Sequence, residues 1–312
     1  MPAVVTHYEF IKCLDKHNKY FDVLALAGQG PDPFFYYGYN LKKRGDAKNI
    51  RKFGTLLHHM DIALVYNFMI EYAMSKKNEE RDILLTFIKG FMYHYCLDRN
   101  AHPYIFYISG FSDVETEKKK YSLEHAKVES YIDALMYKKC RESKPIRQML
   151  NVKDEHLKII SNMFGDLGRK YFNLKYVNEK TYYYGVKDMR FVNHLLVSPL
   201  KIKKVLFMIF FKNHRLNAMS GPLNLKSLKK YDLFNSTKQK WLNCVNGNIR
   251  FESFYELFDN AKRDAETVNS IIEKAQNGEN ILNDLKRFTH NIDHDGFEVD
   301  AHKKYFKLVI TK

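Results

Sequence analysis

Three side chains that can bind a metal ion lie at helical spacing in the first half of the chain. They are His94, Asp98 and His102, at positions i, i+4 and i+8. On a helix this spacing stacks side chains on one face, so two imidazoles and a carboxylate would point to a common place. Pro103 disfavours the helical conformation at His102, so we expect His102 at or just past the end of that helix.

A second pair of potential ligands, His125 and Glu129, repeats the i, i+4 spacing. A single histidine is more often a core or surface residue than a ligand. Two pairs close together favour a metal site, because zinc takes nitrogen and oxygen donors from separate elements. Six further candidate ligands precede these pairs: His7, His17, Asp32, His58, His59 and Asp61.

Five motifs occur in a characteristic order. They are residues 1–10, residues 28–35, the Leu-His-His triplet at 57–59, residues 94–103 and the pair His125 and Glu129. In order and spacing they resemble the zinc-dependent phospholipase C family, and its non-secreted bacterial branch most. The resemblance covers residues 1 to about 140 and continues more weakly to about 275.

The resemblance implies an all-α fold, a multi-helix bundle of the phospholipase C and P1 nuclease kind, with two or three zinc ions between helices. It also implies ligand sets: Asp32, His58, His94 and Asp98 for one zinc, His102, His125 and Glu129 for a second, and His7 with a bridging Asp98 for a third. Asp32 would act as a ligand or as the general base.

Two departures from the family pattern bear on function. Secreted members complete the third site with a processed N-terminal tryptophan, whereas this chain begins with Met1 and Pro2. In secreted members an aromatic residue that helps to hold the lipid head group follows the position of Asp32. Here that position is Pro33, so the head-group choice of the family does not carry over.

The adjacent histidines His58 and His59 cannot both face the metals. Neighbouring residues on a helix point about 100° apart. We favour His58 as the ligand, and His59 is then a surface group or a group that supports the ligands.

Composition gives independent limits. The chain has 312 residues, 51 Lys and Arg against 36 Asp and Glu, and a net charge of +15, which favours anionic partners such as lipid head groups or nucleic acid. A solvated lysine-rich face is the plainer interpretation of this charge.

The four cysteines form no CxxC pair, and no secretory apolar segment follows Met1, so we expect a cytoplasmic protein, peripheral at the membrane if it binds lipid. Phosphate-binding loops and serine-nucleophile motifs do not occur.

Hydrophobic periodicity predicts a mostly helical chain. Because the motifs become sparse beyond residue 145, the resemblance implies a zinc-binding helical core at 1–145 and a mainly helical part with an irregular C-terminal extension at 146–312. The predicted helices are 6–26 with a break near 16–19, 54–74, 79–101, 122–139, 154–171, 252–276 and 279–289; 28–38 is a predicted loop, 109–120 an exposed connection, and 298–311 a strand or extended tail.

Two segments in the second half of the chain leave alternatives open. The apolar run 205–211, between Lys204 and Lys212, is far too short to cross a bilayer. It is either a buried helix or strand, or a shallow contact with a membrane surface. His290 and His294 form a further i, i+4 pair outside the resemblance, for which a second metal site is the less favoured interpretation.

Three classes of function fit these features. The favoured one is a zinc-dependent phosphodiesterase that cleaves phospholipid to diacylglycerol and a phosphorylated head group. The others are a nuclease acting on single-stranded nucleic acid and a zinc-binding protein without catalytic activity. No protein partner can be inferred from the sequence.

Overall fold

The computed structural model describes residues 4–40, 44–110, 115–140, 143–196, 202–210, 215–222 and 224–302. The described chain is mostly helical, as the sequence predicts, with one short two-stranded hairpin. The first half contains α1 (Val4–Asp15), α2 (Phe21–Ala27), α3 (Pro33–Tyr36), α4 (Ala47–His58), α5 (Ala63–Met74), α6 (Asn78–Ser109) and α7 (Glu115–Lys139). The second half contains η1 (Ile146–Gln148), α8 (Asp154–Asp166), η2 (Leu167–Tyr171), α9 (Glu179–Leu196), α10 (Ile202–Phe210), α11 (Arg215–Met219), η3 (Leu225–Lys230), β1 (Trp241–Leu242), β2 (Ile249–Arg250), α12 (Phe254–Gln276) and α13 (Leu282–Thr289).

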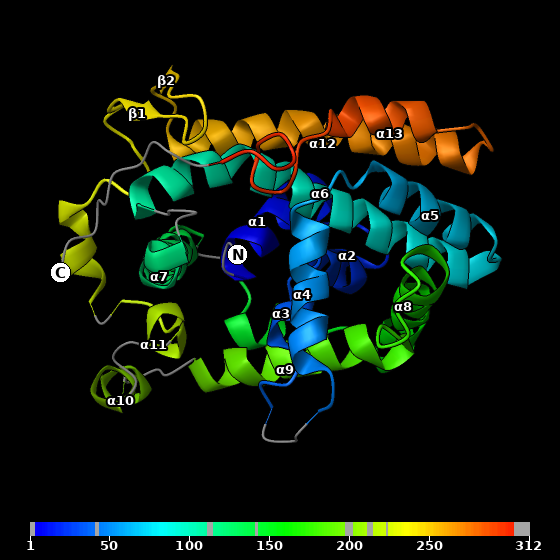
Figure 1. Cartoon of the computed structure of the whole chain (residues 1–312), viewed down its shortest axis with the longest axis horizontal. Coiled ribbons are helices and arrows are strands. Elements are labelled where there is room, and N and C mark those ends of the chain that lie inside the picture. The colour runs from blue at the N-terminus through cyan, green and yellow to red at the C-terminus, as the bar shows by residue number, and fades with distance from the viewer. Residues whose placement is uncertain are drawn as a thin grey trace.

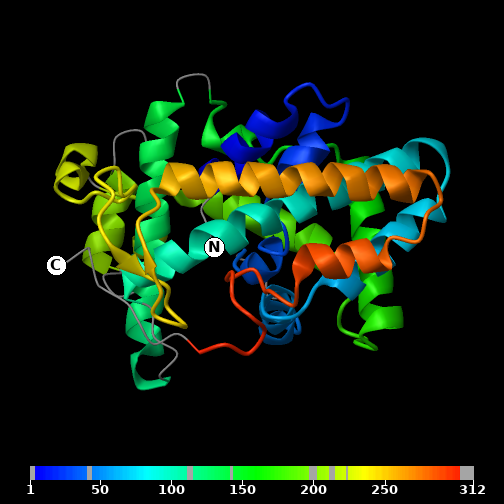
Figure 2. The same cartoon turned by 90° about the horizontal axis from the view of Figure 1, so that it is seen from above.

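The longest helix, α6, lies at the centre of the fold (Figure 1). Helix α12 runs alongside it (Figure 2), and α2, α5, α7 and α8 also pack against it. Gly90 permits the close approach of α2, because a Cβ there would lie 2.6 Å from the Cβ of Ala27. Helix α6 is therefore the element against which α2, α5, α7, α8 and α12 are positioned.

The prediction that α6 ends near His102 is wrong. The helix continues through Pro103 to Ser109, and Gly110 ends it in the left-handed conformation (φ 65°). A proline inside a helix removes one backbone hydrogen bond, to the carbonyl of Arg99. Gly296 packs against this part of α6, since a Cβ there would lie 2.8 Å from the Cγ of Pro103. Tertiary packing thus accommodates the proline without ending the helix.

Two other predicted boundaries also differ from the structure. The single helix at 54–74 is interrupted after His58, and α5 begins at Ala63. The carboxylate of Asp61 accepts a hydrogen bond from the backbone N–H of Ala63 (3.1 Å) and one from the hydroxyl of Thr289 (2.8 Å). Asp61 therefore stabilises the start of a new helix. The predicted connection at 109–120 is already helical from residue 115.

The main hydrophobic core draws side chains from both halves of the chain. The Phe164 ring of α8 stacks on the Tyr182 ring of α9, with centroids 4.2 Å apart, and Phe34 of α3 packs edge-on against both. Gly185 of α9 lies so close to Pro33 that a Cβ would come within 2.6 Å of its carbonyl oxygen. This packing fixes α3, and with it the neighbouring Asp32. The boundary between 145 and 146 itself stays a prediction.

Three further observations concern single segments. Cys96 is fully buried in the core. The predicted tail at 298–311 lies largely outside the described residues, which end at 302. Among the described helices, none combines the length and the apolar composition that a bilayer crossing requires.

Candidate metal centre

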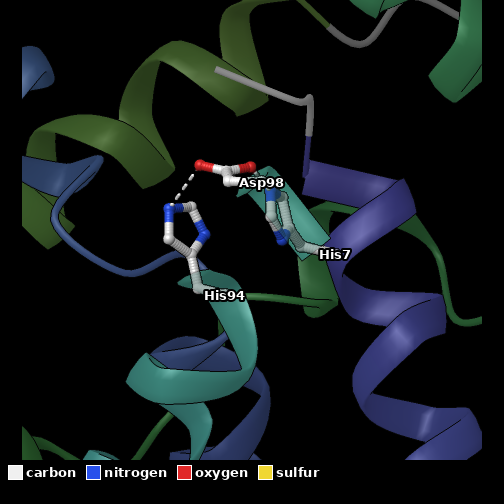
Figure 3. A group of neighbouring side chains, drawn as sticks. All are labelled: His7, His94 and Asp98. Carbon is white, nitrogen blue, oxygen red and sulfur yellow. Dashed lines mark ion pairs between the residues drawn. The ribbon is translucent and has the colours of Figure 1, made fainter. Parts of the chain in front are cut away.

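The carboxylate of Asp98 lies between imidazoles from two helices. Its Oδ2 is 3.0 Å from Nε2 of His94, one turn earlier on α6, and its Oδ1 is 3.2 Å from Nε2 of His7 on α1. Figure 3 shows the two rings on either side of the carboxylate. All three side chains are fully buried. The three ligand atoms are close enough together to hold one metal ion.

A second group shares His94 and adds two residues from the N-terminal half. Asp32 precedes α3, and its Oδ1 lies 3.1 Å from Nε2 of His58, the last residue of α4. Their ligand atoms lie near that of His94. Gly30 makes room for the His94 ring, because its φ is +50° and a Cβ there would lie 2.7 Å from Nε2 of His94. The loop predicted at 28–38 thus presents a carboxylate to the centre, with the short helix α3 inside it.

A third group lies further along α6, where α7 packs against it. Nε2 of His125 is 3.0 Å from Oε1 of Glu129, and Nε2 of His102 is 3.5 Å from the same oxygen. All three side chains are buried. Because α6 continues through Pro103, His102 stays on the face that carries Asp98, and its Nε2 lies 3.9 Å from Oδ1 of that residue.

Backbone carbonyls orient three of the histidines. In each case Nδ1 lies within hydrogen-bond distance of a carbonyl oxygen, to which it can donate, so that Nε2 can keep its lone pair for a metal. The pairs are His58 with Gly54 (2.7 Å), His94 with Gly28 (3.0 Å) and His102 with His294 (2.8 Å).

Several polar atoms of these groups lack a hydrogen-bond partner although they are buried. They are both ring nitrogens of His7, Oδ2 of Asp32, Nε2 of His94, both oxygens of Asp98 and Nε2 of His102. Buried polar atoms without partners are uncommon and destabilising, by about 1–3 kcal/mol each. Nitrogen and carboxylate donors that converge in this way fit zinc. The residues present thus fit the zinc that the resemblance implies.

The group of His7, His94 and Asp98 and the group of Asp32, His58 and His94 share the imidazole of His94. His94 directs one nitrogen into the centre, and a nitrogen lone pair can bind one ion. In this centre the described residues therefore offer one site around His94 and one around His102, with Asp98 between them, and a separate group of possible ligands lies at His59, Asp293 and Asp295. A third ion next to His7 would need donors beyond these, and the N-terminal residues 1–3 lie outside the described part of the chain.

Burial and neighbouring charges together set the protonation of the centre. Although burial raises the pKa of Asp98, the imidazoles of His94 and His102 hold it well below its usual range. Burial also opposes protonation of His102, but Asp98 and Glu129 raise its pKa to about 9. In the metal-free protein this imidazole is therefore protonated at neutral pH, and a metal ion must displace the proton.

Asp133, one turn beyond Glu129 on α7, holds α1 in place. Its two carboxylate oxygens accept hydrogen bonds from the backbone N–H groups of Val5 and Thr6, each 2.8 Å long, at the start of α1. Such N–H groups have no partner within their own helix. This contact places α1, and therefore His7, against α7.

The other candidate ligands lie elsewhere. The side chain of His59 is half exposed, and its Nδ1 is 3.4 Å from Oδ2 of Asp293 and 3.6 Å from Oδ2 of Asp295. The structure therefore brings His58, and not His59, to Asp32 and His94. His17 is exposed and belongs to none of the metal-binding groups found among the described residues. Asp61 stabilises the start of α5, as described above.

Sequence reasoning missed His294 as part of this centre. The residue is fully buried, and its ring lies 5.0 Å from that of His58 and 5.6 Å from that of His94, centroid to centroid. Neither ring nitrogen has a hydrogen-bond partner. Burial and the two neighbouring histidines keep the pKa of His294 well below its usual range, so the ring is neutral. The i, i+4 spacing of His290 and His294 indicated a possible second metal site in this segment. His290 is exposed, however, and of the two only His294 reaches the centre.

The chain matches no known protein-family model, and no curated protein or solved structure is significantly similar to it. These comparisons therefore identify no family for the chain.

We predict that the purified chain binds at least two zinc ions. The two sites around His94 and His102 together offer seven ligands, which suffice for two ions. Elemental analysis after dialysis against zinc measures the number of zinc ions per chain. Because protonated His102 competes with the metal, affinity should rise as the pH increases towards about 9. Less than about one equivalent of zinc per chain would contradict this stoichiometry.

The substitution Asp98→Asn should lower the zinc content, because an amide oxygen neither bridges two cations well nor offsets their charge. Asp82→Asn, at an exposed position of the same helix, is the matched control and should bind zinc like the unchanged protein. Equal zinc binding by the two variants would show that Asp98 is only a buried helix residue.

The substitution His294→Gln should weaken metal binding about 10- to 100-fold if the ring supports or joins the centre. The absorption spectrum of the cobalt-substituted protein should also change, because it reports the donors around the ion. His290→Gln changes the exposed histidine of the same segment and should affect neither quantity. Identical behaviour of both variants would exclude a role for His294.

Proposed function

We propose that this chain is a zinc-dependent phosphodiester hydrolase of the phospholipase C kind, built on a helical bundle of the phospholipase C and P1 nuclease type. The observation that carries the proposal is the position of Asp98 between two sets of buried donors. Its Oδ2 faces His94, and its Oδ1 lies 3.9 Å from Nε2 of His102. A carboxylate placed in this way suits two cations that share one substrate.

The donor set agrees with hydrolysis of a phosphodiester. Bound zinc supplies a Lewis acid for the phosphoryl oxygens and lowers the pKa of a water molecule to near neutrality. The carboxylates of Asp32, Asp98 and Glu129 would offset part of the metal charge. Zinc sites with fewer protein ligands than four leave a position for water or substrate, as the three ligands His102, His125 and Glu129 would.

Asp32 is the residue we propose for a direct role in the reaction. Its Oδ1 pairs with His58, while its Oδ2 is buried and has no hydrogen-bond partner. That second oxygen can bind a metal or accept the proton of an attacking water molecule. The packing of α9 against Pro33 holds it in place.

Phospholipid is the substrate class that we favour over nucleic acid. The motif resemblance supports lipid, and the net charge of +15 would hold the protein on an anionic membrane surface. The same charge agrees with binding of single-stranded nucleic acid, which is the second candidate. We also propose that the protein is cytoplasmic and acts peripherally at membranes.

The zinc-loaded protein should hydrolyse a soluble short-chain phosphatidylcholine or phosphatidylinositol, and a chelator should abolish the reaction. Asp32→Asn should lower the turnover number by about 10²- to 10⁴-fold, the range expected for loss of a general base. Asp22→Asn is the control and should leave turnover unchanged, because Asp22 belongs to none of the groups that can hold metal and its Oδ2 lies 3.9 Å from Nδ1 of His156.

Single-stranded DNA and a chromogenic phosphodiester complete the substrate panel. Much faster cleavage of DNA than of any phospholipid would overturn the lipid preference. A zinc-loaded protein that cleaves none of these substrates would indicate a zinc-binding protein without catalytic activity.

A further inference from the structure

The short helix α10 carries an unusually exposed set of apolar side chains. The interpretation of residues 205–211 as a buried segment is therefore wrong for the described residues. Six large hydrophobic side chains of α10 are between 42% and 72% exposed: Ile202, Val205, Leu206, Met208, Ile209 and Phe210. Exposed apolar patches of this kind on a folded protein mark an interaction surface.

The apolar side chains form one continuous face. Ile202, Val205, Leu206 and Ile209 recur at the i, i+3, i+4 and i+7 spacing of one side of a helix. Lys204 occupies the opposite side and is buried, and its ammonium group donates hydrogen bonds to the carbonyl oxygen (2.8 Å) and side-chain oxygen (3.0 Å) of Asn217. The helix thus turns a lysine towards the protein and its apolar face towards solvent, the reverse of an ordinary surface helix.

Helix α10 is connected to the candidate metal centre through α11. It packs against α11 at the edge of the molecule (Figure 1). The carbonyl oxygen of Ala218 on α11 accepts a hydrogen bond from the hydroxyl of Ser130 (2.8 Å). Ser130 directly follows Glu129 on α7, and α11 packs along α7. One helix, α11, therefore contacts both α10 and α7, the helix that carries His125 and Glu129.

We propose that α10 docks the protein on an anionic lipid surface, lying in the plane of the interface with its apolar face inserted. A helix of nine residues is about 14 Å long, which suits a shallow position and not a crossing. In the sequence, lysines lie before the helix at 201, within it at 203 and after it at 212. The net charge of +15 is complementary to anionic lipid and opposes pairing of two copies of this chain.

Docking itself does not require catalysis, but its use for presenting substrate rests on the proposed function. An α10 that enters the head-group region would bring α7 and its ligands close to phosphodiesters in the same membrane. The proposal therefore predicts different effects on lipid in vesicles and on soluble substrate.

Sedimentation of the full chain with vesicles tests the proposal. The protein should bind vesicles that contain phosphatidylserine, more weakly as salt increases, and bind vesicles of phosphatidylcholine alone far less. The double substitution Ile209→Ser with Phe210→Ser should lower partitioning at least about tenfold, because two large side chains lose their burial in lipid. Both residues are exposed, so the melting temperature should stay unchanged.

The control is the double substitution Ile249→Ser with Phe251→Ser, which removes two exposed apolar side chains (55% and 53%) at the β hairpin. It should bind vesicles like the unchanged protein. Equal binding by the α10 variant, or no binding by the unchanged protein, would overturn the proposal. So would a dimer in solution that the α10 substitutions convert to monomer, since the face would then pair two copies.

Hydrolysis separates this proposal from the proposed function. The α10 variant should cleave a short-chain soluble phospholipid at the normal rate and vesicle lipid at least about tenfold more slowly, in line with its lost partitioning. Normal vesicle binding without any hydrolysis would refute the proposed function alone. Normal hydrolysis of vesicle lipid by the variant would refute docking through α10 alone.

Discussion

The structure depends on one costly arrangement, a carboxylate and several imidazoles that are buried together. Asp98 is fully buried between His7, His94 and His102, and neither of its oxygens has a well-formed hydrogen bond. Charged groups are buried in proteins when they are paired or bind a metal, because desolvation otherwise costs several kcal/mol. The surrounding helices are arranged to hold these groups together. In our account the compensation comes from metal ions bound between them.

Helix α6 joins the metal centre to the remainder of the fold. One of its faces carries the ligands, and another fixes the C-terminal segment. The hydroxyl of Tyr95 donates to the carbonyl oxygens of Thr289 (3.2 Å) and Ile292 (2.8 Å), and Arg99 binds the carboxylate of Asp264 on α12 (2.8 Å from Nε to Oδ2). These contacts bring the backbone of His294 to His102 and its ring to His58 and His94. The second half of the chain therefore contributes His294 to the centre, in addition to packing against the core.

Local spacing made part of the centre predictable from the sequence, whereas long-range contacts did not. The i, i+4 pairs on α6 and α7 follow from helical geometry, and the structure places them together as predicted. The proximity of Asp32 to His58 and of His7 to Asp98 was expected only from the family resemblance. His294 was not predicted to be part of the centre because no local sequence pattern indicates that residue 294 folds back onto α6. The prediction that helix α6 ends near Pro103 was wrong because tertiary packing outweighed a local conformational preference. Whether the apolar run of α10 is buried or exposed could not be predicted, because a core helix and an interfacial helix have the same composition.

Anomalous X-ray diffraction at the zinc absorption edge, from crystals of the zinc-loaded protein, tests this account most directly. Two strong peaks should appear, one on either side of Asp98. One should lie among Asp32, His58 and His94, and the other among His102, His125 and Glu129. A protein that takes up zinc elsewhere and leaves Asp98 without a neighbouring ion would contradict it.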